Sequence, residues 1–328
     1  MTGAAAEPSA DPPAEPVHPR PPDPSPRESK PSRDLALRLL TAALLIPLVL
    51  LLIWAGGLWF LGAVIAVILL GLREFYRLIE DKGAHPLKNF GYLAGAALPV
   101  VAYVGDEYHA TILMTAVLLA VMVAQLGKAE ISEALASISG TFFGVFYVGW
   151  LLTHAVVLRQ FSQVASRKWG ALGVQSVPDQ AGAFYMFFAL ATVIACDAGA
   201  YFAGRAYGRH KLAPHISPGK TVEGAVGGVA AGLLAALVAK GLSQLFMPSL
   251  SEGLPWLVVV PFGVVLSVVG IVGDLVESLL KRDAKVKDTG ALLPGTGGVL
   301  DRIDSSLLGI PVMYYLVLAY HYLRLVRP

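Results

Sequence analysis

Long apolar runs dominate the chain and predict membrane-spanning helices. A helix that crosses the hydrocarbon core of a bilayer needs roughly 20 mostly apolar residues, and runs approaching that length recur along the sequence. Nine segments qualify: Leu39–Ala55, Leu58–Leu72, Phe90–Val104, Thr111–Leu126, Thr141–Leu158, Ala183–Ala203, Val222–Phe246, Leu254–Gly273 and Leu307–Leu325. We therefore predict an all-α polytopic membrane protein with about nine transmembrane helices.

The polar positions between these spans change in character along the chain. The stretch after Leu72, Arg-Glu-Phe-Tyr-Arg-Leu-Ile-Glu, predicts that the second helix continues into water with an amphipathic face. Up to about Leu158 the spans are nearly free of charge, whereas acidic, basic and glycine residues crowd the span ends from Ala183 onward. We predict a transmembrane bundle over residues 35–160 and a catalytic transmembrane domain, carrying the polar site, over residues 183–328.

Residues 1–34 have a different composition, rich in proline and charge. Such a segment buries too little apolar surface to offset the entropy lost on ordering, so we expect a disordered tail; a partner-binding polyproline segment is the alternative. The chain as a whole is 55% hydrophobic and 15% charged, against about 25% charged in soluble domains. The single cysteine, Cys196, excludes an internal disulfide and a multi-cysteine metal site.

The distribution of basic residues predicts how the protein lies in the membrane. With nine spans, 19 of the 25 Lys and Arg residues fall on the side of the N-terminus and six on the other side. Basic residues concentrate on the cytoplasmic side of membrane proteins. We therefore expect an integral protein of the cell (inner) membrane, with the N-terminus and the polar site in the cytoplasm.

An acidic residue lies inside the sixth apolar run. Asp197 is within two turns of the predicted cytoplasmic end of this span. A carboxylate is costly to insert into a membrane and usually faces a water-filled cavity or a partner. We expect Asp197 to bind a metal ion or a substrate; an ion pair with Arg205 or Arg209 is the structural alternative.

A second polar motif precedes the seventh run. Its Gly-Lys-Thr is similar to a phosphate-binding P-loop, but that motif needs a glycine where this chain has Pro214. We expect Ser217 to cap a helix that begins after Pro218, with Lys220 and Thr221 at an anion site on the helix N-terminus. An ordinary capped helix start is the alternative.

Three glycines spaced four residues apart follow this motif. A small helical face of this kind permits close helix packing, either within the chain or in a homodimer. The glycines are Gly224, Gly228 and Gly232.

The richest polar segment lies between the last two runs, from Asp274 to Asp304. If its first part is helical, one face carries Asp274, Glu277, Ser278 and Lys281, at positions i, i+3, i+4 and i+7. Asp301 and Asp304, one turn apart, can present two carboxylates to one metal ion, and Mg²⁺ prefers carboxylate and phosphate oxygens. A solvated run of charges is the alternative. The sequence shows no catalytic set of a nucleophile, a histidine and an acid. The combination of carboxylates for a metal ion with lysines and arginines for phosphates therefore favours phosphoryl or nucleotidyl transfer to a lipid.

The same segment carries a pattern that resembles the signature of the phosphatidate cytidylyltransferases (CDP-diacylglycerol synthases). The matching residues are Ser278, Lys281, Arg282, Lys287, Asp288, Pro294, Gly295, Gly297, Gly298, Asp301, Arg302 and Asp304. The likeness covers roughly Ala183–Ser305 and includes the motifs around Asp197 and Lys220. The family usually has His where this chain has Thr296, so we expect activity to persist with a changed pH dependence.

The resemblance implies the reaction of CTP with phosphatidic acid to give CDP-diacylglycerol and pyrophosphate, with Mg²⁺, a second cation being left open. The expected metal ligands, also catalytic, are Asp197, Asp274, Asp301 and Asp304, and Lys281 completes the catalytic set. The expected substrate contacts are Ser217, Lys220, Thr221, Ser278, Arg282, Lys287 and Arg302. CTP, phosphatidic acid and the bilayer are the expected partners, without nucleic acid.

Two other functions remain open at the level of sequence. A CTP-dependent polyprenol or phytol-type lipid kinase would share the needs for metal and nucleotide. A transporter would also explain an acid inside a span. It predicts, however, that charged or broken helices lie near the middle of the membrane, in two corresponding halves of the chain. No internal repeat of that kind is visible in this chain.

Overall fold

The computed structural model describes residues 31–105, 107–128, 131–290, 292 and 297–326. Helices make up most of this part of the chain. In order they are α1 (Pro31–Ala55), α2 (Gly57–Asp81), α3 (Lys88–Val104), α4 (Glu107–Gln125), α5 (Ala134–Gly144), the π-helix η1 (Val145–Trp150), α6 (Leu151–Arg159), α7 (Phe161–Trp169), α8 (Ala171–Ser176), α9 (Ala181–Tyr207), α10 (Val222–Phe246), α11 (Pro248–Ser251), α12 (Trp256–Asp283) and α13 (Leu300–Val326). Two short strands, β1 (Lys211–Ala213) and β2 (Ser217–Thr221), lie between α9 and α10.

Each of the nine predicted spans overlaps a helix, and seven helical segments are long and apolar enough to cross a membrane. These are Gly57–Asp81, Tyr108–Gln125, Ala134–Arg159, Ala181–Tyr207, Val222–Phe246, Trp256–Asp283 and Leu300–Val326. The other two predicted spans lie in α1, whose described apolar part is Ala43–Ala55, and in α3, which has 17 residues. The protein is thus an all-helical, polytopic membrane protein, and a total of nine spans stays a prediction.

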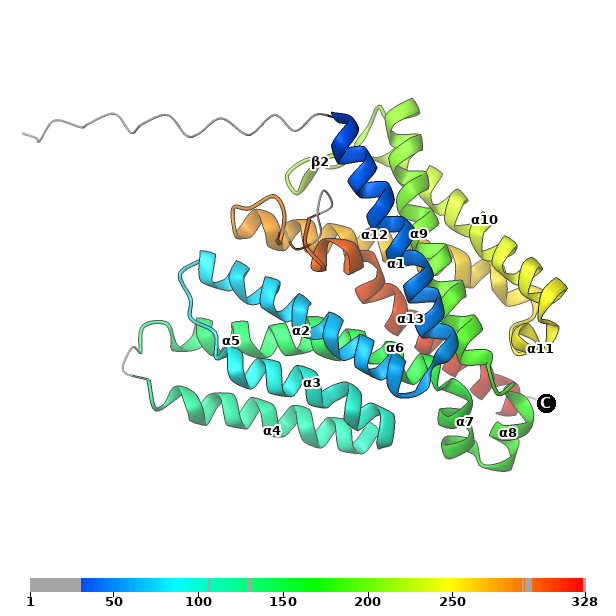
Figure 1. Cartoon of the computed structure of the whole chain (residues 1–328), viewed down its shortest axis with the longest axis horizontal. Coiled ribbons are helices and arrows are strands. Elements are labelled where there is room, and N and C mark those ends of the chain that lie inside the picture. Colours follow the sequence, from blue (N-terminus) through cyan, green and yellow to red (C-terminus); the bar gives the residue numbers. More distant parts are fainter. Residues whose placement is uncertain (1–30, 106, 129–130, 291, 293–296, 327–328) are drawn as a thin grey trace, which may run out of the picture.

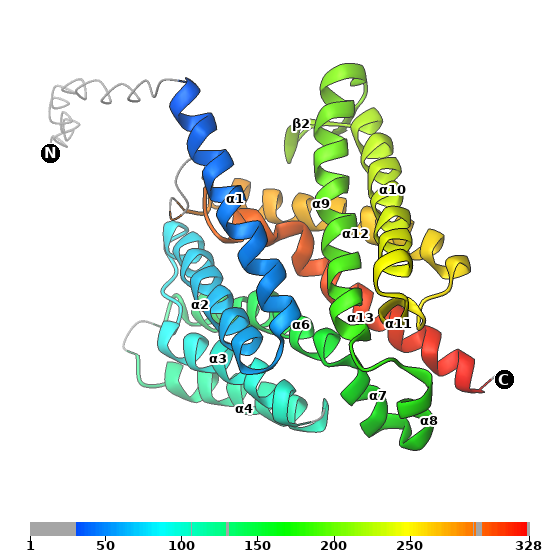
Figure 2. The same cartoon turned by 45° about the vertical axis from the view of Figure 1, so that its right-hand side comes forward.

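Two groups of helices flank a central pair. Figure 1 and Figure 2 show α2, α3, α4 and α5 together on one side and α9 and α10 side by side on the other, with α12 and α13 running between them. α1 begins at Pro31, so the last four residues of the expected tail are helical, and residues 1–30 lie outside the described part.

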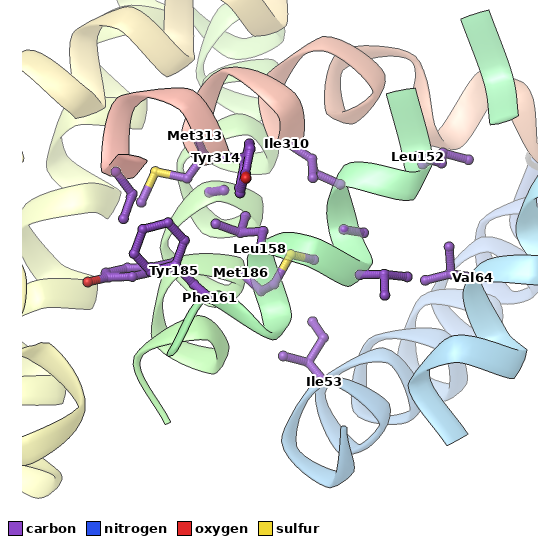
Figure 3. Packing of buried hydrophobic residues seen from close by; sticks show 14 of the residues in the cluster. Ile53, Val64, Leu152, Leu158, Phe161, Tyr185, Met186, Ile310, Met313 and Tyr314 are labelled. Atoms are coloured by element: carbon purple, nitrogen blue, oxygen red, sulfur yellow. The ribbon is translucent and has the colours of Figure 1, made fainter. Parts of the chain in front are cut away.

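The main apolar core joins helices from both groups. Figure 3 shows Phe161, Tyr185 and Tyr314 packed around this core, which Ile53 of α1 also reaches. The hydroxyl of Tyr185 in α9 lies 3.0 Å from Nε2 of the buried His321 in α13. This hydrogen bond satisfies two polar groups inside the apolar core, where an unpaired polar group would be costly, and it fixes α13 against α9.

The predicted fifth span is interrupted by a change of helix type. The π-helix η1 separates α5 from α6 and brings Gly149 against α3, where a Cβ atom would lie 3.4 Å from the Cα of Gly95. Single turns of π-helix often occur at functional sites. Here the turn also directs Tyr147 toward the interior of the protein.

The prediction that only helices form was incomplete at one place. β1 and β2 pair antiparallel, with Lys211 opposite Thr221. Ser217 therefore lies in a strand and does not cap a helix; α10 begins at Val222, and the Thr221 hydroxyl accepts the cap hydrogen bond from the N–H of Gly224 at 3.1 Å. Thr221 is extended, as an N-cap residue usually is, which is why the helix starts four residues later than expected.

The glycine face of α10 packs inside the chain, against α9. A Cβ atom at Gly224 would lie 2.9 Å from the carbonyl oxygen of Ala200, and one at Gly228 would lie 2.8 Å from that of Cys196. Larger side chains would push the two helices apart. Of the two roles that the sequence left open for this face, the structure assigns it to contact within the chain.

Candidate active site

Four chain segments meet at one end of the helix bundle. The C-terminal parts of α9 and α12 lie beside the N-terminal parts of α10 and α13, because successive helices in this part of the chain run in opposite directions. The polar residues that crowd these span ends are thereby brought into one region, although more than 100 residues separate Asp197 from Asp304 in sequence.

Three carboxylates from two helices form the centre of this region. Asp274, Glu277 and Asp304 each offer an oxygen that lies within 4.8 Å of the other two. Asp274 and Glu277 share one face of α12 because they are one helical turn apart, and Asp304 comes from the first turns of α13. Within the described ranges, this is the one group of three potential metal-ligating side chains found so close together.

The surroundings of Glu277 show that this group suits a metal ion. The Glu277 side chain is 0% exposed, and its Oε1 has no hydrogen-bond partner among the described residues. Its one close cation is Lys281, with Nζ 2.8 Å from Oε2. A buried carboxylate with an unpartnered oxygen, close to other carboxylates that repel it, is stabilised by a cation. The oxygen donors are those that Mg²⁺ prefers, so these residues fit a divalent ion.

Tyr147 of η1 is a second buried group without a partner near these acids. The residue is 4% exposed, and its hydroxyl forms no hydrogen bond within the described part of the chain. Glu277 and Asp304 are close enough for their charges to act on it. The hydroxyl is therefore available to donate to an oxygen that enters the site. This contribution from the N-terminal helices was not predicted from the sequence.

Asp197 lies beside the three carboxylates. The Ser305 hydroxyl donates to Oδ1 of Asp197 at 3.2 Å, and Ser305 directly follows Asp304. The alternative, an ion pair with Arg205 or Arg209, is absent from the described residues; Arg205 donates to the Tyr201 hydroxyl instead. The structure therefore places Asp197 at the site that contains Asp304.

A cavity of about 450 Å³ opens next to Asp197 and Asp274. Nζ of Lys220 lies 2.6 Å from Oδ2 of Asp274, and the Ser278 hydroxyl lies 3.4 Å from Oδ1 of the same carboxylate. Thr221 and the first turn of α10 form part of the wall, together with Ser217, Tyr201 and Arg205. The positive end of a helix and two cations thus face one cavity, an arrangement that suits a phosphate-bearing ligand.

Asp301, predicted as a metal ligand, lies outside the three-carboxylate group. Its Oδ1 pairs with Nζ of Lys281 at 2.8 Å. Its Oδ2 accepts hydrogen bonds from the N–H groups of Thr289 and Gly298, at 3.0 and 2.8 Å, and from the Thr289 hydroxyl at 3.0 Å. These bonds connect both ends of the turn between α12 and α13. In this structure Asp301 holds that turn and Lys281 in place.

Glu74 of α2 is the residue whose position the sequence prediction missed. It was expected on a solvated extension, yet it is 3% exposed. Its carboxylate accepts hydrogen bonds from the N–H groups of Val299 and Leu300, at 2.9 and 2.8 Å, and from the Thr289 hydroxyl at 3.2 Å. One signal was available: Glu74 shares a helical face with the buried Gly71 and Leu78, and a lone acid on an apolar face needs a buried partner.

Most other predicted contact residues lie at the edge of this region. Arg282 is exposed and donates to the carbonyl oxygens of Ile216 and Val286. Lys287 and Arg302 are also exposed, in the turn after α12 and in the first turn of α13. The structure does not bring these three cations into the carboxylate group. Pro294, Gly295 and Thr296 of the signature lie outside the described residues.

Comparison with known proteins identifies the family. A model described as the cytidylyltransferase family matches residues 36–320. The chain belongs to the cytidylyltransferase family. The match starts in α1 and ends in α13, so it covers both α2, which contains Glu74, and the C-terminal helices that contain the acids.

Three relatives illustrate the likeness within the cytidylyltransferase family. Phosphatidate cytidylyltransferase of Synechocystis sp. is 32% identical over 290 residues, 85% of this chain and 95% of that protein. The enzyme of the same name from Bacillus subtilis is 45% identical over 139 residues, 42% of this chain and 49% of that protein. Phosphatidate cytidylyltransferase 5, chloroplastic, of Arabidopsis thaliana is 32% identical over 286 residues, 83% of this chain and 67% of that protein.

Proposed function

We propose that this member of the cytidylyltransferase family is a phosphatidate cytidylyltransferase, which converts CTP and phosphatidic acid into CDP-diacylglycerol and pyrophosphate. The observation that carries the proposal is the group formed by Asp274, Glu277 and Asp304 beside a cavity that contains Lys220. Carboxylates for a metal ion, next to cations for phosphates, are what nucleotidyl transfer requires. The printed names of the relatives agree with this activity.

Asp274, Glu277 and Asp304 would hold a Mg²⁺ ion, with Asp197 as a further candidate ligand. The ion would neutralise charge on the CTP phosphates. Lys220 is placed to bind phosphate oxygens in the cavity, because its ammonium group is at the wall and contacts Asp274. Lys281 lies between Glu277 and Asp301 and so keeps these two acids apart and oriented. Asp301 acts here as a positioning residue.

The reaction needs no protein base. A phosphate oxygen of phosphatidic acid attacks the α-phosphorus of CTP, and a new P–O bond forms. The bond from the α-phosphorus to the oxygen bridging to the β-phosphate breaks, and pyrophosphate leaves with that electron pair. The attacking oxygen is already ionised near neutral pH, because the second pKa of a phosphate monoester is about 6. The buried Tyr147 hydroxyl is a hydrogen-bond donor for an oxygen of the reacting groups.

The location of the site supports a cytoplasmic orientation in the cell membrane. Asp197, Lys220, Asp274 and Asp304 all lie at the helix ends that the basic residues assign to the cytoplasm. CTP is a cytoplasmic metabolite with several negative charges, so it would reach the cavity from water. Phosphatidic acid would reach the same end of the helices from the bilayer.

Radiolabelled CTP tests this function and separates it from a lipid kinase. Purified protein in mixed micelles with phosphatidic acid and Mg²⁺ should transfer label from the α-phosphate of CTP to lipid, and label from the γ-phosphate should appear in pyrophosphate. Chelation by EDTA should stop the transfer, and added Mg²⁺ should restore it. Transfer of the γ-label to a lipid, or no transfer of either label, would refute the proposal.

A further inference from the structure

A second cavity, of about 600 Å³, lies away from the candidate active site. It is lined by parts of α3, α4, η1, α6, α7 and α13 and shares no lining residue with the cavity beside Asp274. On α13, its lining residue Tyr314 is ten positions after Asp304, which corresponds to about 15 Å along a helix axis. This cavity therefore lies at a different depth in the bundle from the cavity beside Asp274, and the proposed reaction does not use it.

The inner wall of this cavity is apolar and aromatic. Trp150, Val157 and Tyr314 line it, and Tyr314 is almost fully buried. Its volume is in the range of roughly 300–1,000 Å³ that small-molecule pockets have. Apolar cavities do not hold water well, and this one is in a protein that is surrounded by lipid. A hydrocarbon chain is the occupant that its wall favours.

The wall also carries polar groups, which include the side chains of Tyr108, Thr153, His154 and Tyr315. Nε2 of His154 lies 3.2 Å from the Tyr315 hydroxyl, and Nδ1 of His154 lies 2.9 Å from the carbonyl oxygen of Trp150. His154 is buried, whereas Tyr315 is half exposed. A ligand with a hydrocarbon chain and an attached polar part could therefore place that polar part beside Tyr315 and the chain deeper in the wall.

Two adjacent cations, Arg167 and Lys168, stand where the cavity opens. They are the exposed residues in the last turn of α7, whose Phe161 and Val164 are buried. A short amphipathic helix with a basic face is typical of a membrane interface. Arg167 donates one hydrogen bond to the carbonyl oxygen of Gly105, which also lines the cavity; the guanidinium group has five N–H donors and suits a phosphate.

We infer that this cavity binds one phospholipid molecule, with its phosphate at Arg167 and Lys168 and one acyl chain against Trp150 and Tyr314. The lipid would connect the N-terminal helices α3 and α4 to α13. In the orientation proposed above, it belongs to the leaflet opposite the active site.

Photocrosslinking with two lipids that share one diazirine-bearing acyl chain tests this inference. One lipid is phosphatidylglycerol and the other is diacylglycerol, which lacks the phosphate. The purified full-length protein in liposomes should be labelled by phosphatidylglycerol in peptides that contain residues 150–157 and 314–315. Labelling of these peptides by diacylglycerol should be weaker by about 30-fold, the factor expected for two cations that each contribute roughly 1 kcal/mol near a membrane surface.

A matched pair of variants tests the role of the cations. The double variant Arg167→Gln/Lys168→Gln should lower phosphatidylglycerol labelling to the diacylglycerol level and leave diacylglycerol labelling unchanged. Arg324→Gln, which removes an exposed cation near the end of α13, should label as wild type does. Unchanged melting temperatures would show that all variants are folded. The inference would be overturned if the two lipids labelled the wild-type protein equally, or if phosphatidylglycerol labelled the double variant as strongly as the wild type. Label spread evenly over α4 and α10 would also overturn it.

Discussion

The carboxylate of Glu74, in α2, accepts a hydrogen bond of 2.8 Å from the N–H of Leu300, the first residue of α13. The first N–H groups of a helix have no partner within that helix. A carboxylate also interacts favourably with the positive end of the helix dipole. A residue of the N-terminal bundle thus caps the helix that carries Asp301 and Asp304, and the two predicted parts of the protein depend on each other at the active site.

Replacing Glu74 by alanine should destabilise the protein and lower its activity. Two buried N–H groups would lose their acceptor, whereas the Thr289 hydroxyl could still donate to Asp301, and each unsatisfied buried group costs about 1–3 kcal/mol. We expect a loss of at least about 2 kcal/mol, read as a fall in the melting temperature of detergent-solubilised protein. Activity should fall by more than tenfold, because Asp304 lies in the next turn of α13.

Glu80→Ala is the matched control for this variant. Glu80 lies on the same helix and pairs with Lys88 at 2.6 Å in a partly exposed position. Exposed ion pairs contribute about 0–1 kcal/mol. If Glu74→Ala and Glu80→Ala had the same melting temperature and the same activity, the capping role of Glu74 would be wrong.

Lys281 should be required for stability as well as for activity. Its ammonium group lies 2.8 Å from oxygens of both Glu277 and Asp301, and removal of one partner from a buried ion pair costs about 3–5 kcal/mol. We expect Lys281→Met to lower the melting temperature strongly. Lys82→Met, which breaks the exposed pair with Asp283, should change it little.

A double variant separates the two roles of Lys281. Adding Glu277→Gln to Lys281→Met removes one of the two unpaired buried charges, so part of the lost stability should return. CDP-diacylglycerol formation should remain absent, because an expected metal ligand is missing as well. A double variant that is no more stable than Lys281→Met alone would show that the pair with Glu277 does not stabilise the fold.

The order of apolar runs was sufficient to locate the helices, because span length and hydropathy are local properties of the sequence. The meeting of Asp274 with Asp304 was also suggested by a charged segment between two spans. The position of Glu74 was not, since its partners are more than 200 residues away. The roles of Asp301 and Glu277 depend on which way two helices face one another, and a spacing of three residues does not determine that.

The start of α10 illustrates a different limit. Both Ser217 and Thr221 have side chains that cap helices well, and the sequence analysis assigned the cap to Ser217. Pairing of β2 with β1 prevails, and it extends the chain up to Thr221. β2 has five residues and β1 has three. Strands this short give too weak a sequence pattern to be predicted from the local sequence.

The glycine face of α10 should be needed for packing within one chain. Gly228→Ala would place a Cβ atom 2.8 Å from the carbonyl oxygen of Cys196, and forcing extra atoms into such a contact costs about 1–3 kcal/mol. Gly62→Ala, with nothing within 4 Å, should be neutral or stabilising by about 0.5–1 kcal/mol. A Gly228→Ala protein with an unchanged melting temperature but a smaller assembled mass would instead assign this face to a dimer.

Single cysteines can test the proposed orientation. In a Cys196→Ser background, His215→Cys is in the hairpin beside the active site and Ala171→Cys is in α8, and both positions are exposed. A membrane-impermeant maleimide should label position 171 in intact cells and position 215 only after the cells are permeabilised. Labelling in the reverse order would contradict a cytoplasmic active site.

The most direct test of the central claim is the rate at which Glu277→Gln transfers the α-phosphate label of CTP to phosphatidic acid. Asp283→Asn, an exposed acid on the same helix, is its matched control. If the group formed by Asp274, Glu277 and Asp304 holds the catalytic ion, the Glu277→Gln rate should fall by at least about 100-fold, with Asp283→Asn close to wild type. A Glu277→Gln protein that is as active as the wild type at every Mg²⁺ concentration would contradict the account.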